Sequence, residues 1–347
     1  MNESRKNLLK NPGAVRRQAV NFASDQLVRI DETSTLPLVI EPATAGVRLV
    51  AWAENNREFL QSKLLKHGAV LFRGFTTKTA EEFEHLIETI CGKALEYTYR
   101  STPRTEVSGR IYTSTEYPAD QTIPLHNEMA YTLTWPGKIF FFCCQPADKG
   151  GETPIADSRQ VYRRIDSKVR EKFIEKGVLY VRNYGGGLDL RWQTVFQTES
   201  RNVVEQYCRQ FSIEYEWKDR DRLRTKQACQ AVVKHPTTGE IVWFNQAHLF
   251  HISSLKSEDR DYLLSSYMEE DLPRNAYYGD GSSIEDYALK NIREAYEEEL
   301  VAFPWHQLDI LMLDNLLAAH GRLPYTGNRK VLVGMGEPSG AQSLPLL

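Results

Sequence analysis

Short apolar runs in an irregular order constrain the fold of this chain more than any other feature. The run KIFFFCCQP at residues 138–146 is continuous and ends with a proline, as in a strand buried on both faces. The runs do not alternate regularly with helices, and no glycine fingerprint follows the first of them, so a parallel doubly wound sheet is excluded. The other runs are AVLFRGF, VLYVRNY, ACQAVVKHP, EIVWFN, FPWHQLDILMLDN and RKVLVGMG.

Apolar residues at helical spacing predict helical cover around this β core. We expect helices over 49–66, 79–91, 158–176 and 199–211, and a charged, helix-rich segment over 256–300. The TTG segment after Pro236 predicts a hairpin. A mainly antiparallel β core with helical cover fits a jelly-roll barrel of about eight strands. We therefore expect an N-terminal arm over residues 1–45 and one jelly-roll domain with helical insertions over 46–347.

Charge and composition exclude several classes of partner. The 347 residues have a formal net charge of -3, and their Lys and Arg residues are scattered, so the basic surface that nucleic acid or an anionic membrane requires is missing. No apolar stretch reaches 18 residues, and the charged N-terminus offers no signal sequence. Five cysteines without a C-x-x-C pair fit reduced thiols. We expect a cytoplasmic protein that acts on a small molecule or a protein-presented substrate.

A histidine and a carboxylate stand two residues apart in PLHNEMAYTLTW, at His126 and Glu128. On a strand this spacing places both side chains on the same face. His320, in DNLLAAHGR, is a candidate third ligand because barrel strands distant in sequence become spatial neighbours. Two histidines and one carboxylate leave the opposite face of a metal open, as in non-haem ferrous oxygenases. H-x-E alone is a weak signal, because short motifs arise often by chance.

Arg329 strengthens this signal. It lies nine positions beyond His320, at the start of a strand pattern. A guanidinium there can bind a carboxylate through two parallel hydrogen bonds, and 2-oxoglutarate offers such a carboxylate at the end away from its metal-chelating keto acid.

The segment PLHNEMAYTLTWPGKIFFFCCQPADKGGETPIADSR, followed by LMLDNLLAAHGRLPYTGNRKVLVGM, resembles the TauD/TfdA family of 2-oxoglutarate dependent dioxygenases. The likeness is to the branch related to the syringomycin biosynthesis hydroxylase, over roughly residues 45 to 337. It implies the double-stranded β-helix, or jelly roll, of the clavaminate synthase/TauD type. It also implies ferrous iron bound by His126, Glu128 and His320, with 2-oxoglutarate and dioxygen as cosubstrates.

The resemblance also implies contacts for the cosubstrate. Thr153, in the GGETP segment, matches the threonine that hydrogen-bonds the cosubstrate carboxylate, and Arg329 matches the arginine of its salt bridge. Lys330 takes the place of Arg329 if the alignment slips by one residue. Arg322 is a further candidate for binding a carboxylate of cosubstrate or substrate, against the alternative of an ordinary surface ion pair.

The implied reaction hydroxylates an unactivated carbon of an amino acid, free or tethered to a carrier protein, in specialised metabolite or antibiotic biosynthesis, and releases succinate and carbon dioxide. Glu128 stands where related halogenases have Gly or Ala, so the halide site is missing, and hydroxylation or desaturation is expected instead of chlorination. The sequence leaves open which amino acid and carbon react, whether the substrate is tethered, and whether the enzyme is a monomer or a homodimer.

Two other functions compete with this hypothesis. Two histidines and a glutamate also make a catalytic zinc site, but H-E-x-x-H is absent and a hydrolase needs neither Thr153 nor Arg329. A jelly-roll binding protein without metal is the non-catalytic alternative, against which the complete ligand set argues.

The remaining candidates have structural interpretations that compete with functional ones. His248 and His251, at i and i+3, suggest a second metal pair but more often serve packing. Arg104 and Arg110 are weaker candidates for binding an amino acid carboxylate, and Glu116 is expected to fix local structure.

Two longer segments also have both a structural and a functional interpretation. The glycines at 185–187 lack phosphate-loop spacing, so they favour a plain turn or a lid over the substrate. The segment GSSIEDYALKNIREAYEEELV favours a solvated helix over a docking surface for a carrier protein.

Overall fold

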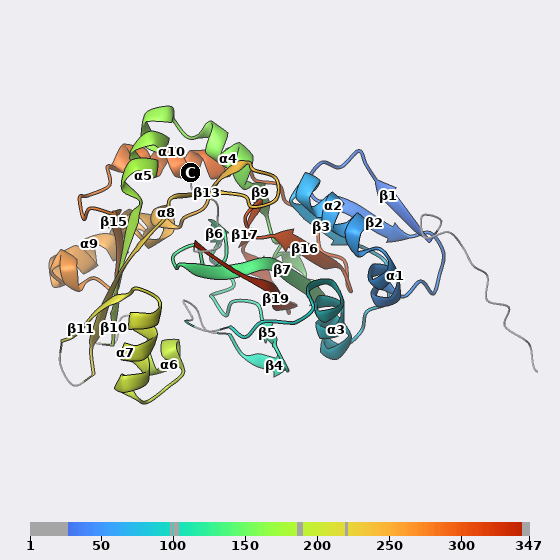
Figure 1. The fold of residues 1–347 in the computed structure, drawn as a ribbon, viewed down its shortest axis with the longest axis horizontal. Helices are drawn as coiled ribbons and strands as arrows, with labels where there is room; N and C mark the ends of the chain where they lie inside the picture. Colours follow the sequence, from blue (N-terminus) through green and yellow to red (C-terminus); the bar gives the residue numbers. More distant parts are fainter. Residues whose placement is uncertain (1–26, 98, 100–103, 186–189, 219–220, 342–347) are drawn as a thin grey trace, which may run out of the picture.

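An eight-stranded, mainly antiparallel sheet forms the centre of the computed structural model, which describes residues 27–97, 99, 104–185, 190–218 and 221–341 (Figure 1). Within this sheet only β2 and β3 run parallel. The strands, in spatial order, are β1 (Val28–Asp31), β2 (Leu38–Pro42), β3 (Ala69–Phe72), β16 (Ile310–Asp314), β7 (Thr134–Gln145), β19 (Lys330–Gly340), β5 (Ile111–Thr113) and β4 (Glu106–Ser108).

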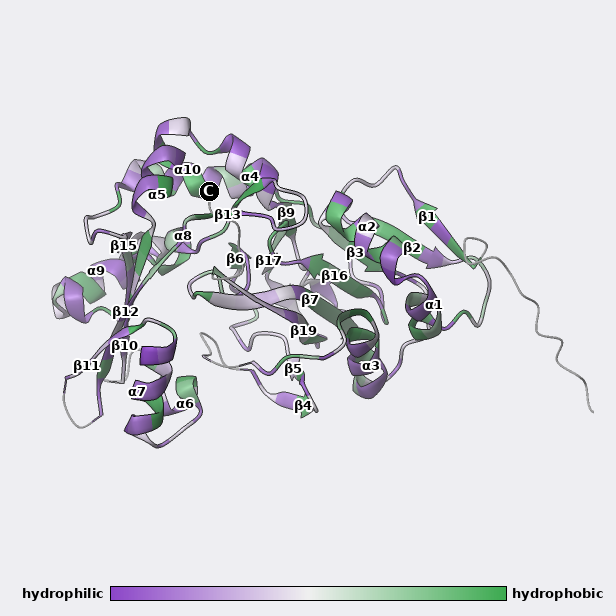
Figure 2. Ribbon diagram, in the orientation of Figure 1, coloured by the Kyte–Doolittle hydropathy of each residue, from purple (hydrophilic) through white to green (hydrophobic). Residues whose placement is uncertain are grey.

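The run KIFFFCC lies in β7, between β16 and β19. Phe140 and Phe142 are fully buried on one face of the sheet with Met312 of β16, while Phe141 and Leu311 contribute to the core on the other face. Figure 2 shows the apolar residues gathered in strands such as β16 and β3, whereas the outer helices alternate between polar and apolar faces. Burial on both faces explains why the sequence shows a continuous apolar run instead of an alternation.

A second layer contains the strands that matter for function. β17 (Ala318–Arg322) pairs antiparallel with β6 (Ile123–His126) on one side and with β9 (Ile155–Asp157) on the other. β8 (Lys149–Gly150) and β18 (Tyr325–Thr326) form a further short antiparallel pair. β8 precedes β9 in the chain, and β18 follows β17. Together with the large sheet they form the expected double-stranded β-helix.

A four-stranded sheet extends this core: β11 (Glu214–Trp217), β12 (Leu223–Cys229), β10 (Val178–Tyr184) and β15 (Arg274–Tyr278). The expected hairpin is present as β13 (Val232–Lys234) and β14 (Ile241–Trp243). The single strand expected over ACQAVVKHP is wrong. The chain leaves β12 at Cys229 and enters β13 at Val232, because β12 pairs with β10 and β13 pairs only with β14.

Two of the expected helices are each divided in two. The helix expected over 49–66 is interrupted at Asn56, which adopts φ -129° and donates from its side chain to the carbonyl of Trp52. The helix expected over 158–176 is interrupted at Asp166, whose carboxylate caps the second half by accepting from the Lys168 N–H. The resulting helices are α1 (Leu49–Asn55), α2 (Arg57–His67), α4 (Ser158–Arg164) and α5 (Ser167–Lys176).

The other expected helices are present within one or two residues. They are α3 (Ala80–Cys91), α7 (Arg201–Gln210), α9 (Ser257–Ser266) and α10 (Asp286–Glu298), with the short α6 (Trp192–Phe196) and α8 (Ala247–Phe250) in addition. No helix in the described part of the chain is long and apolar enough to cross a membrane. The boundary at residue 45 stays a prediction; within the arm before it, residues 28–42 add β1 and β2 to the large sheet.

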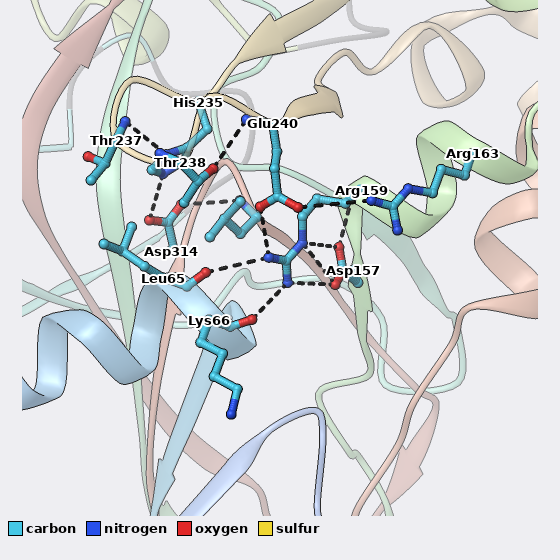
Figure 3. Close-up of polar contacts among 11 residues, drawn as sticks. Leu65, Lys66, Asp157, Arg159, Arg163, His235, Thr237, Thr238, Glu240 and Asp314 are labelled. Atoms are coloured by element: carbon cyan, nitrogen blue, oxygen red, sulfur yellow. Dashed lines mark hydrogen bonds and ion pairs between the residues drawn. The ribbon is translucent and has the colours of Figure 1, made fainter.

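A polar junction ties the second layer to its surroundings (Figure 3). Arg159 forms an ion pair with Asp157 at the end of β9, and a second ion pair with Glu240 in the β13–β14 hairpin. It also donates to the carbonyls of Leu65 and Lys66 in α2. One guanidinium thus joins a helix, a strand and a hairpin that are distant in sequence.

His235 joins the same hairpin to the end of β16. Its Nδ1 accepts the N–H groups of Thr237 and Thr238, which leaves Nε2 to donate to Asp314 at 3.2 Å. The other oxygen of Asp314 accepts the N–H groups of Leu316 and Leu317. The loop between β16 and β17 is therefore held by side chains as well as by its strands.

Replacement of Phe142 by Ala is expected to lower the free energy of unfolding by about 3–5 kcal/mol, because it leaves a cavity in a fully buried position beside Phe83. The midpoint of urea unfolding measures the loss. Ile174→Ala, at a position 43% exposed on α5, is the control and should change stability by no more than about 0.5 kcal/mol. Equal effects of the two substitutions would contradict the placement of β7 in the core.

Candidate metal centre

The pairing of β6 with β17 brings His126 and His320 together. The two residues are direct cross-strand partners, and their ring centroids are 4.6 Å apart. Gly321, the next residue, lies so close to β6 that a Cβ atom there would be 2.5 Å from the Ile123 carbonyl oxygen. The absence of a side chain at Gly321 therefore allows the two strands to approach.

Glu128 joins the two histidines, although not in the way expected. β6 ends at His126, so Glu128 lies in the turn that follows and not on a strand. Asn315, in the loop between β16 and β17, holds this turn: its Oδ1 accepts the Glu128 N–H at 2.8 Å and its Nδ2 donates to the Glu128 carbonyl at 2.9 Å. One ligand atom from each of His126, Glu128 and His320 lies within 4.8 Å of the others.

Asn127 points away from this cluster and anchors the turn from behind. Its Nδ2 donates to Ser158 Oγ at 3.0 Å and to the Asn315 carbonyl at 2.7 Å. Gln246 Nε2 donates to the Asn127 carbonyl at 2.7 Å. The sequence analysis did not identify Asn315 or Gln246, and only their polarity between apolar runs could have drawn attention to them.

Both imidazoles present a nitrogen that suits a metal. His126 Nδ1 lies 2.8 Å from the Pro124 carbonyl oxygen, which can only accept, so Nδ1 carries the proton and Nε2 keeps its lone pair. Burial lowers the pKa of His126, although Glu128 opposes the shift, and burial lowers the pKa of His320 well below its usual range. Neutral imidazoles with one carboxylate are a donor set that suits ferrous iron.

His320 is buried and packs against an aromatic ring. The Phe141 ring lies 5.0 Å from its imidazole, measured between centroids, and its Nδ1 is buried without a hydrogen-bond partner among the described residues. Its Nε2 lies 3.8 Å from Glu128 Oε2. The imidazole is therefore oriented toward the carboxylate, as metal ligation requires.

A cavity opens beside His126 and His320, which both line it. Thr153 and Arg329 line it, and Thr153 Oγ1 accepts hydrogen bonds from Trp305 Nε1 at 3.2 Å and from Arg329 Nη2 at 3.4 Å. With both lone pairs used, the hydroxyl hydrogen is available to a ligand. The full lining is Arg104, Ser114, Thr115, Ile123, His126, Phe141, Thr153, His320, Gly321, Arg322 and Arg329.

Arg329 is half-buried and held in place. Its Nε donates to the Gly151 carbonyl at 2.8 Å and its Nη1 to Ser114 Oγ at 3.3 Å. Gly151 has φ 75°, and a Cβ there would lie 2.9 Å from Arg329 Cδ. Burial, and then the charge of Arg322, lower the pKa of Arg329 to about 10, so it remains a cation at neutral pH. Lys330, the alternative, is exposed.

Arg322 also lines the cavity, but its terminal nitrogens are engaged. Nη1 donates to the Tyr117 carbonyl, and Nη2 donates to the carbonyls of Pro118 and Gln121. Its Nε is buried and has no partner in the described part of the chain. Arg322 thus fixes the loop before β6 and adds a positive charge near Arg329.

Arg104 and Arg110 differ in their surroundings. Arg104 is buried and donates to Glu128 Oε2 at 2.8 Å, so it binds a carboxylate of the protein itself. Arg110 lies near the exposed Glu96, at 3.7 Å, and is not among the residues that line the cavity. Glu116 accepts from the hydroxyls of Thr105 and Thr113, which is a local structural role.

His248 and His251 do not form a second metal site in the described part of the chain, where the only cluster of three ligand residues is the one above. His248 Nε2 bonds the Leu125 carbonyl at 3.0 Å and its ring stacks on Tyr296, so it packs behind β6. His251 Nδ1 caps the turn at Ser253. Of the glycines at 185–187, the last two lie outside the described residues.

Comparison with known proteins agrees with this fold and site. The model of the family described as "Taurine catabolism dioxygenase TauD, TfdA family" matches residues 32–335. The dapdiamide synthesis protein DdaC of Enterobacter agglomerans is 44% identical over 275 residues, which cover 79% of this chain and 84% of that protein. A clavaminate synthase-like protein of Arabidopsis thaliana is 32% identical over 323 residues, covering 88% and 94% respectively.

Solved structures share the fold at low identity. PvcB of Pseudomonas aeruginosa, an Fe, alpha-ketoglutarate dependent oxygenase from an isonitrile synthetic pathway, superimposes with TM-score 0.53 and 18% identity, over 91% of this chain and 93% of that one. AAD-2 in complex with Mn(II) and N-oxalylglycine gives 0.52 and 13%, over 89% and 96%.

The fold and the family match define the class: the chain belongs to the TauD/TfdA family. It is an Fe(II)- and 2-oxoglutarate-dependent oxygenase, which sets aside the zinc hydrolase and the metal-free binding protein.

His248 should make the stability of the protein depend on pH. Burial lowers its pKa to about 3, from about 6.5 in the unfolded chain, so the native state stays neutral while the unfolded state takes up a proton. Stability is therefore present above pH about 6.5 and is lost as the pH falls toward about 3, by about 1.4 kcal/mol per pH unit. His248→Gln, which keeps a donor for Leu125, should reduce the slope of unfolding free energy between pH 6.5 and 4.5 by about this amount. An unchanged slope would contradict the burial of a neutral His248.

Proposed function

We propose that His126, Glu128 and His320 hold the ferrous iron of this oxygenase, and that the enzyme hydroxylates an unactivated carbon of an amino acid, free or tethered to a carrier protein. The observation that carries the assignment is the convergence of the three ligand atoms within 4.8 Å of one another. They are the only such cluster in the part of the chain that the structure describes.

The side chains around the three ligands suit an open metal face. The three ligands come from β6, β17 and the turn between β6 and β7, and two of them, His126 and His320, line the cavity. When bound, the iron and 2-oxoglutarate supply dioxygen activation, with release of succinate and carbon dioxide. Phe141 packs against the His320 ring, and the Pro124 carbonyl keeps His126 in the tautomer that ligates through Nε2.

Arg329 and Thr153 are proposed to bind the distal carboxylate of 2-oxoglutarate. Arg329 offers its guanidinium and Thr153 its hydroxyl hydrogen from the same wall of the cavity. Arg322, which also lines the cavity, adds a second positive charge. Among the described residues, Arg322 and Arg329 form no ion pair with a carboxylate within 4 Å. Arg322 is buried and Arg329 is half-buried, and two such cations side by side favour an anionic ligand.

Specialised metabolism is the proposed setting. A relative 44% identical to this chain takes part in dapdiamide synthesis by its name, which supports a role in antibiotic biosynthesis. Membership of the family branch that contains the syringomycin biosynthesis hydroxylase is part of this proposal. Glu128 at the carboxylate position supports hydroxylation over halogenation, and the mass of the product separates hydroxylation from desaturation.

Succinate formation tests the reaction and the ligand assignment together. Anaerobic, iron-loaded protein should form succinate from 2-oxoglutarate after addition of oxygen, faster in the presence of one member of an amino acid panel. His126→Ala should lower the rate of succinate formation by more than the about 10–100-fold that is typical when a residue hydrogen-bonded to a metal ligand is replaced. His251→Ala, at a half-buried turn that does not line the cavity, should retain the rate. Stimulation only by carrier-tethered amino acids would identify the tethered substrate, whereas full activity in His126→Ala would contradict the assignment.

Arg329 and its neighbour offer a matched pair for the cosubstrate site. Arg329→Met should raise the KM for 2-oxoglutarate by about 10–100-fold, because a charged hydrogen bond to the distal carboxylate is lost. Lys330→Met, at an exposed position, should leave this KM unchanged. The reverse pattern would assign the cosubstrate carboxylate to Lys330.

A further inference from the structure

Arg104 lies directly against Glu128. Its Nη2 donates to Glu128 Oε2 at 2.8 Å, and both side chains are only 4% exposed. We propose that Arg104 is a positioning residue that sets the direction in which the Glu128 carboxylate faces the metal. This inference rests on the proposed assignment of Glu128 as an iron ligand.

Glu128 needs such a tether because its other hydrogen bonds within the described residues are made by its backbone. Asn315 bonds the N–H and the carbonyl of Glu128, but neither bond restricts the torsions of the side chain. Glu128 also lies beyond the end of β6, so no strand neighbour aligns it. A glutamate has one more methylene group than an aspartate, and therefore one more torsion to restrict. The ion pair with Arg104 restricts it at the carboxylate end.

Arg104 is itself held in place. Its guanidinium lies over the Tyr97 ring, with 4.4 Å between Cζ and the ring centroid. Tyr97 is 1% exposed; its N–H donates to the Tyr112 hydroxyl and its carbonyl accepts from Gln197 Nε2. The donor that meets Glu128 therefore comes from a rigid wall and not from a mobile surface side chain.

The contact is made at the carboxylate oxygen that lies near His320. Glu128 Oε2, which accepts from Arg104, is also the oxygen 3.8 Å from His320 Nε2. A carboxylate oxygen accepts more than one bond, so the hydrogen bond leaves a lone pair for a metal. Hydrogen bonds to ligating carboxylates are a general means of orienting them. Arg104 thus acts on the metal through Glu128.

Anaerobic titration with Fe(II), followed by 2-oxoglutarate, tests this inference by affinity and by the visible absorption of the complex. Arg104→Met should weaken Fe(II) binding by about 10–100-fold and shift or weaken the absorption at saturating iron. Arg104→Lys, which keeps the charge with a single donor group, should fall between the wild type and Arg104→Met.

Arg224→Met is the matched control. Arg224 is a buried arginine paired with Asp271 at 2.6 Å, but it lies on β12 in another sheet. It should lower thermal stability and leave iron affinity and the spectrum unchanged, which separates a loss of packing from a loss of positioning.

The outcomes distinguish a failure of the iron-ligand assignment from a failure of the role proposed for Arg104. Wild-type protein that binds no Fe(II) would overturn the ligand assignment and this inference with it. Wild-type affinity and spectrum in Arg104→Met would overturn this inference alone. If Arg104→Met does not fold, Arg104→Lys and Arg104→Gln carry the test, and a wild-type spectrum in both would overturn the inference.

Discussion

The pairing of β17 between β6 and β9 is the constraint on which the rest of the site depends. It sets His320 opposite His126 on one side and opposite Ile155 on the other. Sheet spacing then determines the distance between the two imidazoles, since cross-strand neighbours have little freedom to separate. Because β17 is fully buried, any change that shifts it also disturbs the core on both sides.

The position of Glu128, the third member of the cluster, depends on side-chain hydrogen bonds instead of strand pairing. The loop between β16 and β17 carries Asn315, which bonds the turn of Glu128, and Asp314, which bonds His235 in the distant hairpin. A loop that fixes a neighbouring turn must itself be fixed, and here buried side-chain hydrogen bonds serve that purpose. The position of Glu128 therefore depends in part on the polar junction shown in Figure 3.

Charge in the cavity is arranged in two zones. Near the histidines, Arg104 balances Glu128, and burial keeps the imidazoles neutral. Farther along the wall, Arg329 lies beside Arg322, and each is surrounded mainly by neutral oxygen atoms. The first zone suits a divalent metal and the second suits an anion. This separation is consistent with the proposed binding of a metal ion and a dicarboxylate in one cavity.

The sequence by itself determined the β core, most helices, the three clustered side chains and two residues, Thr153 and Arg329, that line the cavity beside them. Apolar runs and helical spacing report burial directly, and residue types report the chemistry that they can perform. It did not determine the breaks at Asn56 and Asp166, the turn that carries Glu128, or the partner of Arg104. Only the tertiary structure decided these features, because they depend on contacts between segments far apart in the chain, which no local pattern encodes.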